Sequence, residues 1–160
     1  MEKLYPDTFW NVSINWTKPK LYENILEKYS EYDDYSYFYK ITGQYSTKEH
    51  KLYYIGKAYY QTVSMRLSQK DHQKRFNKLS KDYPKHKLYV SFGIVKLANG
   101  HITEKRIDQI ESLLIYSHDF DHLLNKQKLN ELKVTEPYII LNSGYRTPLY
   151  KEIHFGIFAK

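Results

Sequence analysis

Residues 37–58 read YFYKITGQYSTKEHKLYYIGKA, and this stretch decides the fold because it predicts two neighbouring strands. Residues 35–42 are rich in aromatic side chains and residues 51–55 form a second such run, a composition typical of strands. The polar segment between them favours an antiparallel hairpin. The second run continues into Gly56, which lets the backbone turn or approach a ligand closely, and Lys57, which presents an ammonium group at the strand exit. A single strand tyrosine is usually a packing residue with a solvated hydroxyl group, so the pair of runs is more informative than any one tyrosine.

The rest of the chain is expected to place helices and further strands around this hairpin. Residues 1–34 are expected to form an extension, with an irregular, tryptophan-bearing start and a short helix that has Pro19 in its first turn. In chain order the other expected elements are a helix over 62–81 with a break near Ser68, a strand over 88–97, a helix that Thr103 caps and that ends near 118, a helix over 121–132, and strands over 138–141 and 154–158. We therefore expect an α+β fold, in which a small, mostly antiparallel sheet is flanked by helices. The main domain is expected over 35–132, with a C-terminal β extension over 133–160 packed on it.

The composition excludes several classes of protein. A chain of 160 residues suits one compact domain, and the absence of cysteine excludes disulfides, thiolate zinc sites and cysteine nucleophiles. Met1 is not followed by a basic region and an apolar run, so no signal peptide is expected. No apolar stretch approaches the roughly 20 residues needed to cross a bilayer. We therefore expect a cytoplasmic protein without a membrane partner.

The positive charge of the chain is concentrated in one segment. The net charge is +7, and residues 66–87 contain eight basic and two acidic residues. Four basic residues recur at every fourth position, which on a helix places them along one face: Arg66, Lys70, Lys74 and Lys78. Together with Arg75 they form a candidate nucleic-acid-binding surface, since clustered cations release counterions on meeting a polyanion. The alternative is an ordinary solvated helix face.

Glu111 is a candidate site residue because it lies within an apolar stripe. In the expected helix after Thr103, Ile107, Ile110 and Leu114 recur at helical spacing, and Glu111 falls on the same face. A carboxylate on an apolar face costs several kcal/mol unless it is paired or binds a cation. A structural salt bridge and a divalent-metal ligand both satisfy this requirement, and the residues alone leave the two open.

Four groups of residues together resemble the motifs of the GIY-YIG nuclease family. They are the strand segments 37–39 and 54–58, Arg66-Leu67 at the tenth position after Gly56, the segment 110–115 around Glu111, and Asn125-Lys126 fourteen positions beyond Glu111. The resemblance spans residues 37–126. It departs from the family at Tyr37, where the family usually has glycine, and at Phe38, which replaces an aliphatic residue.

This resemblance implies a divalent-metal-dependent endonuclease that hydrolyses DNA phosphodiester bonds with Mg²⁺ or Mn²⁺. Glu111 would hold a single divalent ion, and no second carboxylate stands in a motif position. Tyr39 would act as general base on the attacking water, which requires nearby cations, with Lys57 the obvious candidate, to lower its phenol pKa from about 10. Arg66 would stabilise the charge of the transition state.

The resemblance also implies accessory residues. Tyr54 would hydrogen-bond a phosphate oxygen, and Asn125 would orient neighbouring groups or bind the DNA backbone. His72, six positions after Arg66, would be an accessory base or phosphate ligand. His118 and His122 have an i, i+4 spacing that can hold zinc, but without cysteine or a third ligand a polar connection between helices is the favoured interpretation.

Among nucleases, a restriction-type enzyme is the leading expectation, because such enzymes read sequence with short additions to a small core. A repair or recombination nuclease that recognises DNA structure is the alternative enzyme. A homodimer would suit double-strand cleavage by a domain with one site. Two alternatives from other classes are a non-catalytic nucleic-acid-binding module of the same fold and a protein-interaction domain whose basic face is incidental.

Overall fold

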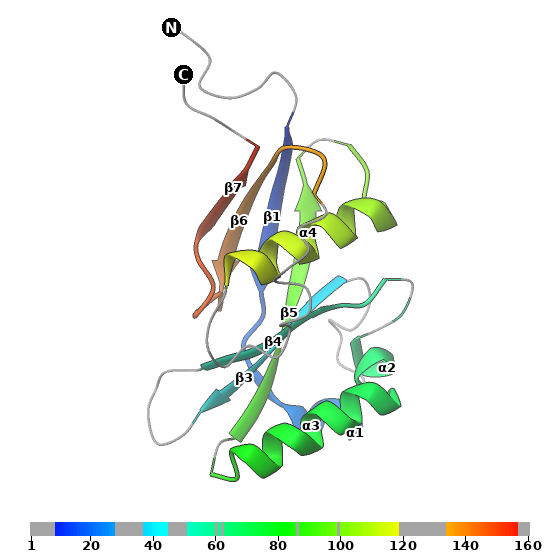
Figure 1. Ribbon diagram of the computed structural model, residues 1–160, viewed down its shortest axis with the longest axis vertical. Coiled ribbons are helices and arrows are strands. Elements are labelled where there is room, and N and C mark those ends of the chain that lie inside the picture. Colours follow the sequence, from blue (N-terminus) through cyan, green and yellow to red (C-terminus); the bar gives the residue numbers. More distant parts are fainter. Residues whose placement is uncertain are drawn as a thin grey trace, which may run out of the picture.

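The computed structural model describes residues 9–27, 37–44, 51–59, 61, 63–85, 87–98, 100–118 and 134–156. These residues form an α+β structure, as expected, in which helices pack on both faces of one curled sheet (Figure 1). The strands are β1 (Trp10–Trp16), β2 (Lys20–Leu21), β3 (Tyr37–Gln44), β4 (Lys51–Lys57), β5 (Lys87–Leu97), β6 (Tyr138–Gly144) and β7 (Glu152–Phe155). The helices are α1 (Tyr22–Glu27), α2 (Val63–Leu67), α3 (Lys70–Asp82) and α4 (Glu104–Ser117).

The sheet has the strand order β4-β3-β5-β1-β6-β7, with β2 pairing to β5. The pairs β3–β4, β3–β5, β1–β5 and β6–β7 are antiparallel, whereas β1 and β6 are parallel. The sheet is therefore mixed, and the expectation of a mostly antiparallel sheet missed the parallel ladder that joins its two halves. Strand β4, which carries Gly56 and Lys57, lies at one edge of this order.

The expectation of an irregular N-terminal start is wrong. Residues Trp10–Trp16 form β1, which lies inside the sheet between β5 and β6. Val12, Ile14 and Trp16 are buried while Ser13 and Asn15 are exposed, because side chains alternate between the two faces of a strand. Pro19 precedes β2 rather than lying in a first helical turn.

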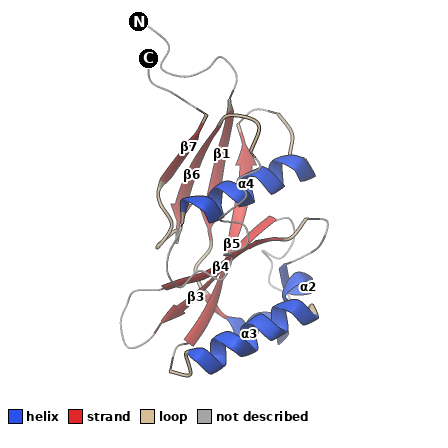
Figure 2. Ribbon diagram, in the orientation of Figure 1, coloured by secondary structure: helices blue, strands red, loops and turns tan. Residues whose placement is uncertain are grey.

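Two separate apolar clusters hold the helices against opposite faces of β3 and β4. One joins Phe38 and Ile55 to the buried stripe of α4, and the other joins Tyr39 and Tyr54 to residues of α1, α2 and α3. Figure 2 shows the same division, with α4 across the part of the sheet that contains β1 and β6, and α3 at the other end. Successive residues of a strand therefore face different helices.

Most other expected elements are confirmed. The helix expected over 62–81 breaks at Ser68 and Gln69, between α2 and α3, and the Thr103 hydroxyl caps α4 by accepting a hydrogen bond from the Arg106 N–H at 3.2 Å. The C-terminal hairpin consists of β6 and β7. The helix expected over 121–132 lies outside the described residues. In the described ranges no helix is long and apolar enough to cross a membrane.

Candidate active site

Tyr39 lies against the backbone of the neighbouring strand, and Gly56 makes this approach feasible. Tyr39 and Gly56 are direct partners in the β3–β4 ladder. A Cβ atom at position 56 would overlap the phenol ring of Tyr39, and it would lie 2.7 Å from the Tyr54 ring. The Tyr39 and Tyr54 ring centroids are 5.9 Å apart. The two aromatic runs thus meet as a pair of phenols over a glycine, on one face of the sheet.

His72, from α3, covers the two phenols, and its protonation state follows from its partners. The Arg75 Nη1 atom lies 2.9 Å from His72 Nδ1, and the Tyr39 hydroxyl lies 3.1 Å from His72 Nε2. A guanidinium only donates hydrogen bonds, so Nδ1 is the acceptor and the proton of the neutral ring is on Nε2. His72 therefore donates to the Tyr39 oxygen, and the Tyr39 hydroxyl also forms a hydrogen bond with the Tyr54 side chain.

Burial holds both groups in their neutral forms. Burial, together with the positive charges of Arg66 and Arg75, lowers the pKa of His72 to about 4, against a smaller opposing effect of Asp71. Burial raises the pKa of Tyr39 well above its ordinary value, and Tyr54 adds to this effect, although Arg66 and Arg75 oppose it. The expected lowering of the Tyr39 pKa is therefore wrong for this structure, because a fully buried phenolate would lose its hydration.

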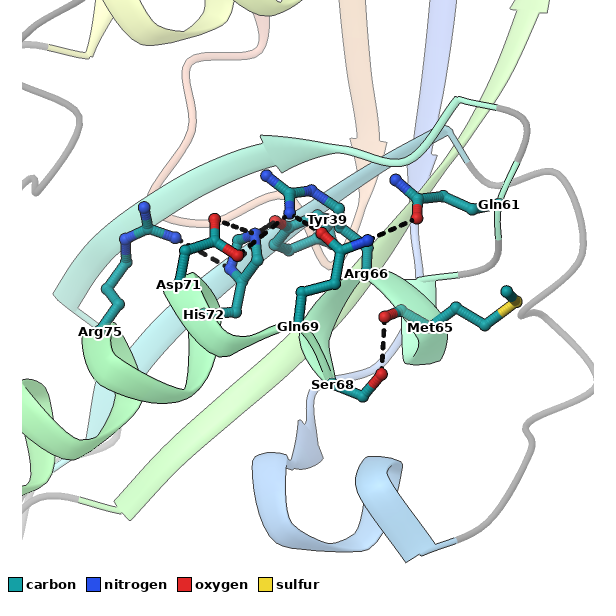
Figure 3. A network of polar contacts seen from close by, with 9 residues as sticks. All are labelled: Tyr39, Gln61, Met65, Arg66, Ser68, Gln69, Asp71, His72 and Arg75. Carbon is teal, nitrogen blue, oxygen red and sulfur yellow. Dashed lines mark hydrogen bonds and ion pairs between the residues drawn. The ribbon is translucent and has the colours of Figure 1, made fainter.

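Arg66 is held at the rim of this cluster by a short polar network, drawn in Figure 3. Its guanidinium hydrogen-bonds the Gln69 side chain and lies 3.4 Å from an Asp71 carboxylate oxygen. Gln69 in turn donates to the Gln61 side-chain oxygen at 3.0 Å. Arg66, at the end of α2, keeps about a quarter of its side chain exposed. Part of its guanidinium-bearing side chain is therefore accessible from solvent.

Tyr37 has a backbone conformation that glycine would adopt more readily. Its φ is 67°, in the left-handed region that costs side-chain-bearing residues free energy. This is the position at which the GIY-YIG motif usually has glycine. The Tyr37 carbonyl accepts a hydrogen bond of 2.8 Å from the Ala58 N–H, which holds the start of β3 to the end of β4. The backbone therefore keeps a glycine-like geometry although the residue is tyrosine.

Lys57 and Glu111 lie on the opposite face of the sheet from Tyr39. Lys57 pairs with Phe38 in the β3–β4 ladder, and its ammonium forms an ion pair with Asp108 and lies 3.9 Å from a Glu111 carboxylate oxygen. Glu111 is only 3% exposed, within the apolar stripe of α4. The salt bridge that we considered for Glu111 is thus present, and Lys57 does not act on Tyr39.

Asp108 is a site residue that the sequence analysis missed. It precedes Glu111 by three positions, a spacing that places both carboxylates on the same side of α4 and could have identified it. Its side chain is half exposed and shares Lys57 with Glu111. The two carboxylates already hold one cation, the lysine ammonium, and oxygen ligands of this kind also suit Mg²⁺. No cluster of three or more metal-ligating side chains occurs among the residues that the structure describes.

The two groups of residues are joined through consecutive positions at the end of β4. The Tyr39 phenol lies over Gly56, and the next residue, Lys57, begins the Lys57–Asp108–Glu111 group. Adjacent Cα atoms are about 3.8 Å apart. Gly56 and Lys57 are consecutive residues of β4, but the groups around them lie on opposite faces of the sheet. The candidate site is therefore the C-terminal end of β4 with the groups on either side of it.

The lysines of α3 form an exposed row, but Arg75 does not belong to it. Lys70, Lys74 and Lys78 are all exposed, on the side of α3 away from its buried residues His72 and Leu79. Arg75 instead stacks on the Tyr54 ring, with its guanidinium carbon 4.1 Å from the centroid. We call Lys70, Lys74 and Lys78 the lysine row.

Two other expected site residues have different outcomes. Asn125 lies outside the described residues. His118 is fully buried, and its Nδ1 donates to the Leu114 carbonyl at 2.6 Å while its Nε2 accepts from the Tyr150 N–H at 2.8 Å. Both ring nitrogens are thus used in hydrogen bonds that connect α4 to the segment after β6, which agrees with the interpretation of His118 as a structural residue. His122 also lies outside the described ranges.

No family model, curated protein or solved structure matches this chain. The geometry of the site and the sequence motifs are therefore the basis for a functional assignment.

Proposed function

We propose that the chain is a divalent-metal-dependent DNA endonuclease of the GIY-YIG type. The observation that carries this proposal is the packing of the Tyr39 phenol on Gly56, its direct partner in the neighbouring strand. In this arrangement the two aromatic motifs place the phenol groups of Tyr39 and Tyr54 close together. The guanidinium groups of Arg66 and Arg75 and the neutral imidazole of His72 lie beside them. The glycine-like φ of Tyr37, at the family's glycine position, supports the same proposal independently.

The chemistry of such a site follows from the charge of a phosphodiester. A phosphate resists attack by a nucleophile until its negative charge is neutralised and the nucleophile is positioned. Arg66 is at the rim, where it would bind a non-bridging phosphate oxygen. Tyr39 is held neutral, accepts from His72 and is fully buried, so a hydrogen bond from its phenol to the phosphate or the attacking water would require His72 to move aside. Tyr54, with Arg75 on its ring, would contact the same phosphate.

Glu111 and Asp108 are the residues that would hold the metal ion. They fit the requirement because they are carboxylates on one side of α4 that already share a cation, the Lys57 ammonium. A bound Mg²⁺ or Mn²⁺ would supply positive charge and acidify a water molecule, which removes the need for a resting phenolate at Tyr39. Because these carboxylates lie on the opposite face of the sheet from Tyr39, a phosphate that contacts both groups would have to lie across the end of β4. Lys57 would then be free to contact the leaving oxygen.

The lysine row is the proposed DNA-binding face. Its three ammonium groups lie exposed along α3, the helix that also supplies His72. Replacing Lys70, Lys74 and Lys78 by glutamate should weaken DNA binding and reduce its dependence on salt, because fewer counterions are released. A matched variant with glutamate at the exposed Lys96, Lys105 and Lys151 has the same charge change and should weaken binding less. Two settings suit this activity: a restriction-type enzyme, which acts in the cytoplasm and as a dimer when it cuts both strands, and a repair or recombination nuclease that recognises DNA structure.

One observation favours a second candidate, a non-catalytic nucleic-acid-binding module of the same fold. The Lys57 ion pair stabilises the buried Glu111 carboxylate without any metal. In that case Glu111 is a structural residue and the phenol cluster only binds phosphate.

Cleavage of supercoiled plasmid distinguishes the two candidates. The endonuclease proposal predicts nicking or linearisation by the wild type with Mg²⁺ or Mn²⁺ but not with EDTA, and loss of cleavage in Glu111→Gln, which keeps the volume of the side chain. DNA binding by Glu111→Gln, measured in EDTA, should remain as in the wild type. Binding without cleavage by the wild type on plasmid and on branched substrates would favour the binding module.

A further inference from the structure

A pocket of about 440 Å³ lies on the sheet away from the phenol cluster. It is formed where the ends of β3 and β6, the start of β5 and the segment after β1 come together, and its main lining residues are Lys18, Pro19, Gln44, Tyr89, Tyr145 and Thr147. Among the residues that the structure describes, none of those that line the pocket is acidic. The aromatic rings, one ammonium group and several hydrogen-bonding groups make the pocket chemically distinct from the phenol cluster.

The wall of this pocket is fixed by a buried lysine. Lys40 is fully buried in β3, and its ammonium donates to the carbonyl oxygens of Tyr145 and Thr147 at 2.6 and 2.8 Å. The Trp16 ring lies 5.3 Å from the same ammonium. No carboxylate pairs with this ammonium in the part of the chain that the structure describes, so its burial is costly and its two hydrogen bonds to the backbone compensate for part of that cost.

Backbone contacts fix the same wall from the other side. The Tyr145 N–H donates to the Trp16 carbonyl at 2.9 Å. Gly144 has a φ of 68°, and a Cβ atom there would lie 2.6 Å from the Trp16 carbonyl oxygen, so only glycine fits between the strand ends. On the opposite side, the Thr17 N–H donates to the Phe92 carbonyl at 2.9 Å, which holds the segment that leads to Lys18. The pocket is therefore largely pre-formed, as ligand pockets usually are.

We propose that this pocket binds one unpaired nucleotide of a DNA substrate, with its base on the tyrosine rings and its phosphate on Lys18; the inference rests on the proposed endonuclease function. Tyr145 is 55% exposed and Tyr89 is half-buried, so aromatic surface is accessible to a base. Every base can stack on an aromatic ring, and an exposed ammonium attracts the phosphate that follows it. Gln44 and Thr147 provide polar groups at the edge of the bound base.

The distance of the pocket from the candidate active site defines its role. Residues 38, 40, 42 and 44 of β3 face the same side of the sheet, and Phe38 is opposite Lys57 while Gln44 lines the pocket. Six residues of a strand span about 20 Å. The nucleotide in the pocket is therefore remote from the reacting phosphate, and it selects DNA that has an unpaired base. This selects the structure-directed class of substrate rather than an uninterrupted duplex.

The test uses two fluorescein-labelled duplexes that differ in one group. Both have a one-nucleotide bulge, but in one of them the bulged position is abasic. Dissociation constants are measured by fluorescence anisotropy in EDTA, so that neither metal binding nor cleavage contributes. The wild type should bind the bulge with a base roughly tenfold more tightly than the abasic bulge, and Tyr145→Ala should lose this preference. Tyr145→Phe should retain it, because the phenylalanine ring stacks equally well.

The controls separate this inference from the proposed function. Tyr150→Ala removes another exposed tyrosine, 52% exposed and outside the pocket lining, and should leave the preference unchanged. Equal affinities of the wild type for the two bulges would overturn the pocket assignment even if plasmid is cleaved. A base preference that depends on Tyr145 in a protein without cleavage activity would uphold the pocket and overturn the endonuclease.

Discussion

Replacing Lys40 by methionine tests how a buried ammonium group makes the free energy of unfolding depend on pH. Lys40 is fully buried in β3, and burial, with the nearby positive charge of Arg146, lowers its pKa from an ordinary value of 10.5 to about 7. Between these two values the unfolded chain binds a proton that the folded protein does not. The free energy of unfolding must therefore rise with pH across this window, and the cost of burying the charge is present in full below pH 7.

The size of this effect follows from the two pKa values. The slope approaches 1.36 kcal/mol per pH unit, which gives a rise of about 2 kcal/mol in the free energy of unfolding from pH 7 to pH 9. The neutral amine still has two N–H groups for the carbonyl oxygens of Tyr145 and Thr147, so the contacts of Lys40 survive its deprotonation. The tyrosines with raised pKa values, such as Tyr22 at about 12, do not titrate in this window.

Urea denaturation followed by circular dichroism at pH 7, 8 and 9 measures the rise directly. Wild type and a Lys96→Met control, which alters an exposed lysine, should both gain stability with pH. Lys40→Met should show no rise, because methionine does not titrate. A rise of equal size in Lys40→Met, or none in the wild type, would refute the reasoning.

Three further predictions concern the candidate active site. Gly56→Ala should lower the free energy of unfolding by roughly 1–3 kcal/mol, because its Cβ atom meets the fully buried Tyr39 ring; a loss within error in urea denaturation would contradict this packing. Tyr37→Gly should be more stable than Tyr37→Ala by about 1 kcal/mol, since both lose the ring and only glycine tolerates a φ of 67°; thermal denaturation showing the opposite order would disprove the left-handed conformation. Because the pKa of His72 is lowered in the folded protein, the unfolded chain takes up the proton at a higher pH. The free energy of unfolding of the wild type should therefore fall as the pH drops from about 6.5 to about 4, more steeply than that of His72→Gln. Parallel pH profiles of the two proteins would count against the buried neutral imidazole.

The sequence predicted the fold class and the elements with strong local signals. Runs rich in aromatic and aliphatic residues predicted β3, β4 and β5, and Thr103 predicted the start of α4, because these signals lie within a few neighbouring residues. Strand β1 was not predicted, although its buried and exposed residues alternate as they do in a strand with one covered face. Its parallel partner β6 lies more than 120 residues away, and no local pattern specifies such a pairing.

The sequence predicted which residues form the candidate site but not how they are arranged in space. The resemblance to the GIY-YIG motifs pointed to Tyr39, Tyr54, Arg66 and His72, which the structure brings together on one face. The assignment of Lys57 to Tyr39 failed, although strand alternation could have prevented it: Gly56 faces Tyr39, so its neighbour Lys57 faces the other side. The raised pKa of Tyr39 was beyond sequence reasoning, because it depends on how completely α3 and the neighbouring strands cover the phenol.

The most direct test of the central claim is the rate of plasmid cleavage by Tyr39→Phe under single-turnover conditions with Mg²⁺. This variant keeps the ring that packs on Gly56 and removes only the hydroxyl group that accepts from His72. The account predicts metal-dependent cleavage by the wild type and a rate at least roughly a hundredfold lower in Tyr39→Phe, as for the loss of one preorganised hydrogen-bonding group in an active site. Cleavage by Tyr39→Phe at the wild-type rate would contradict the account.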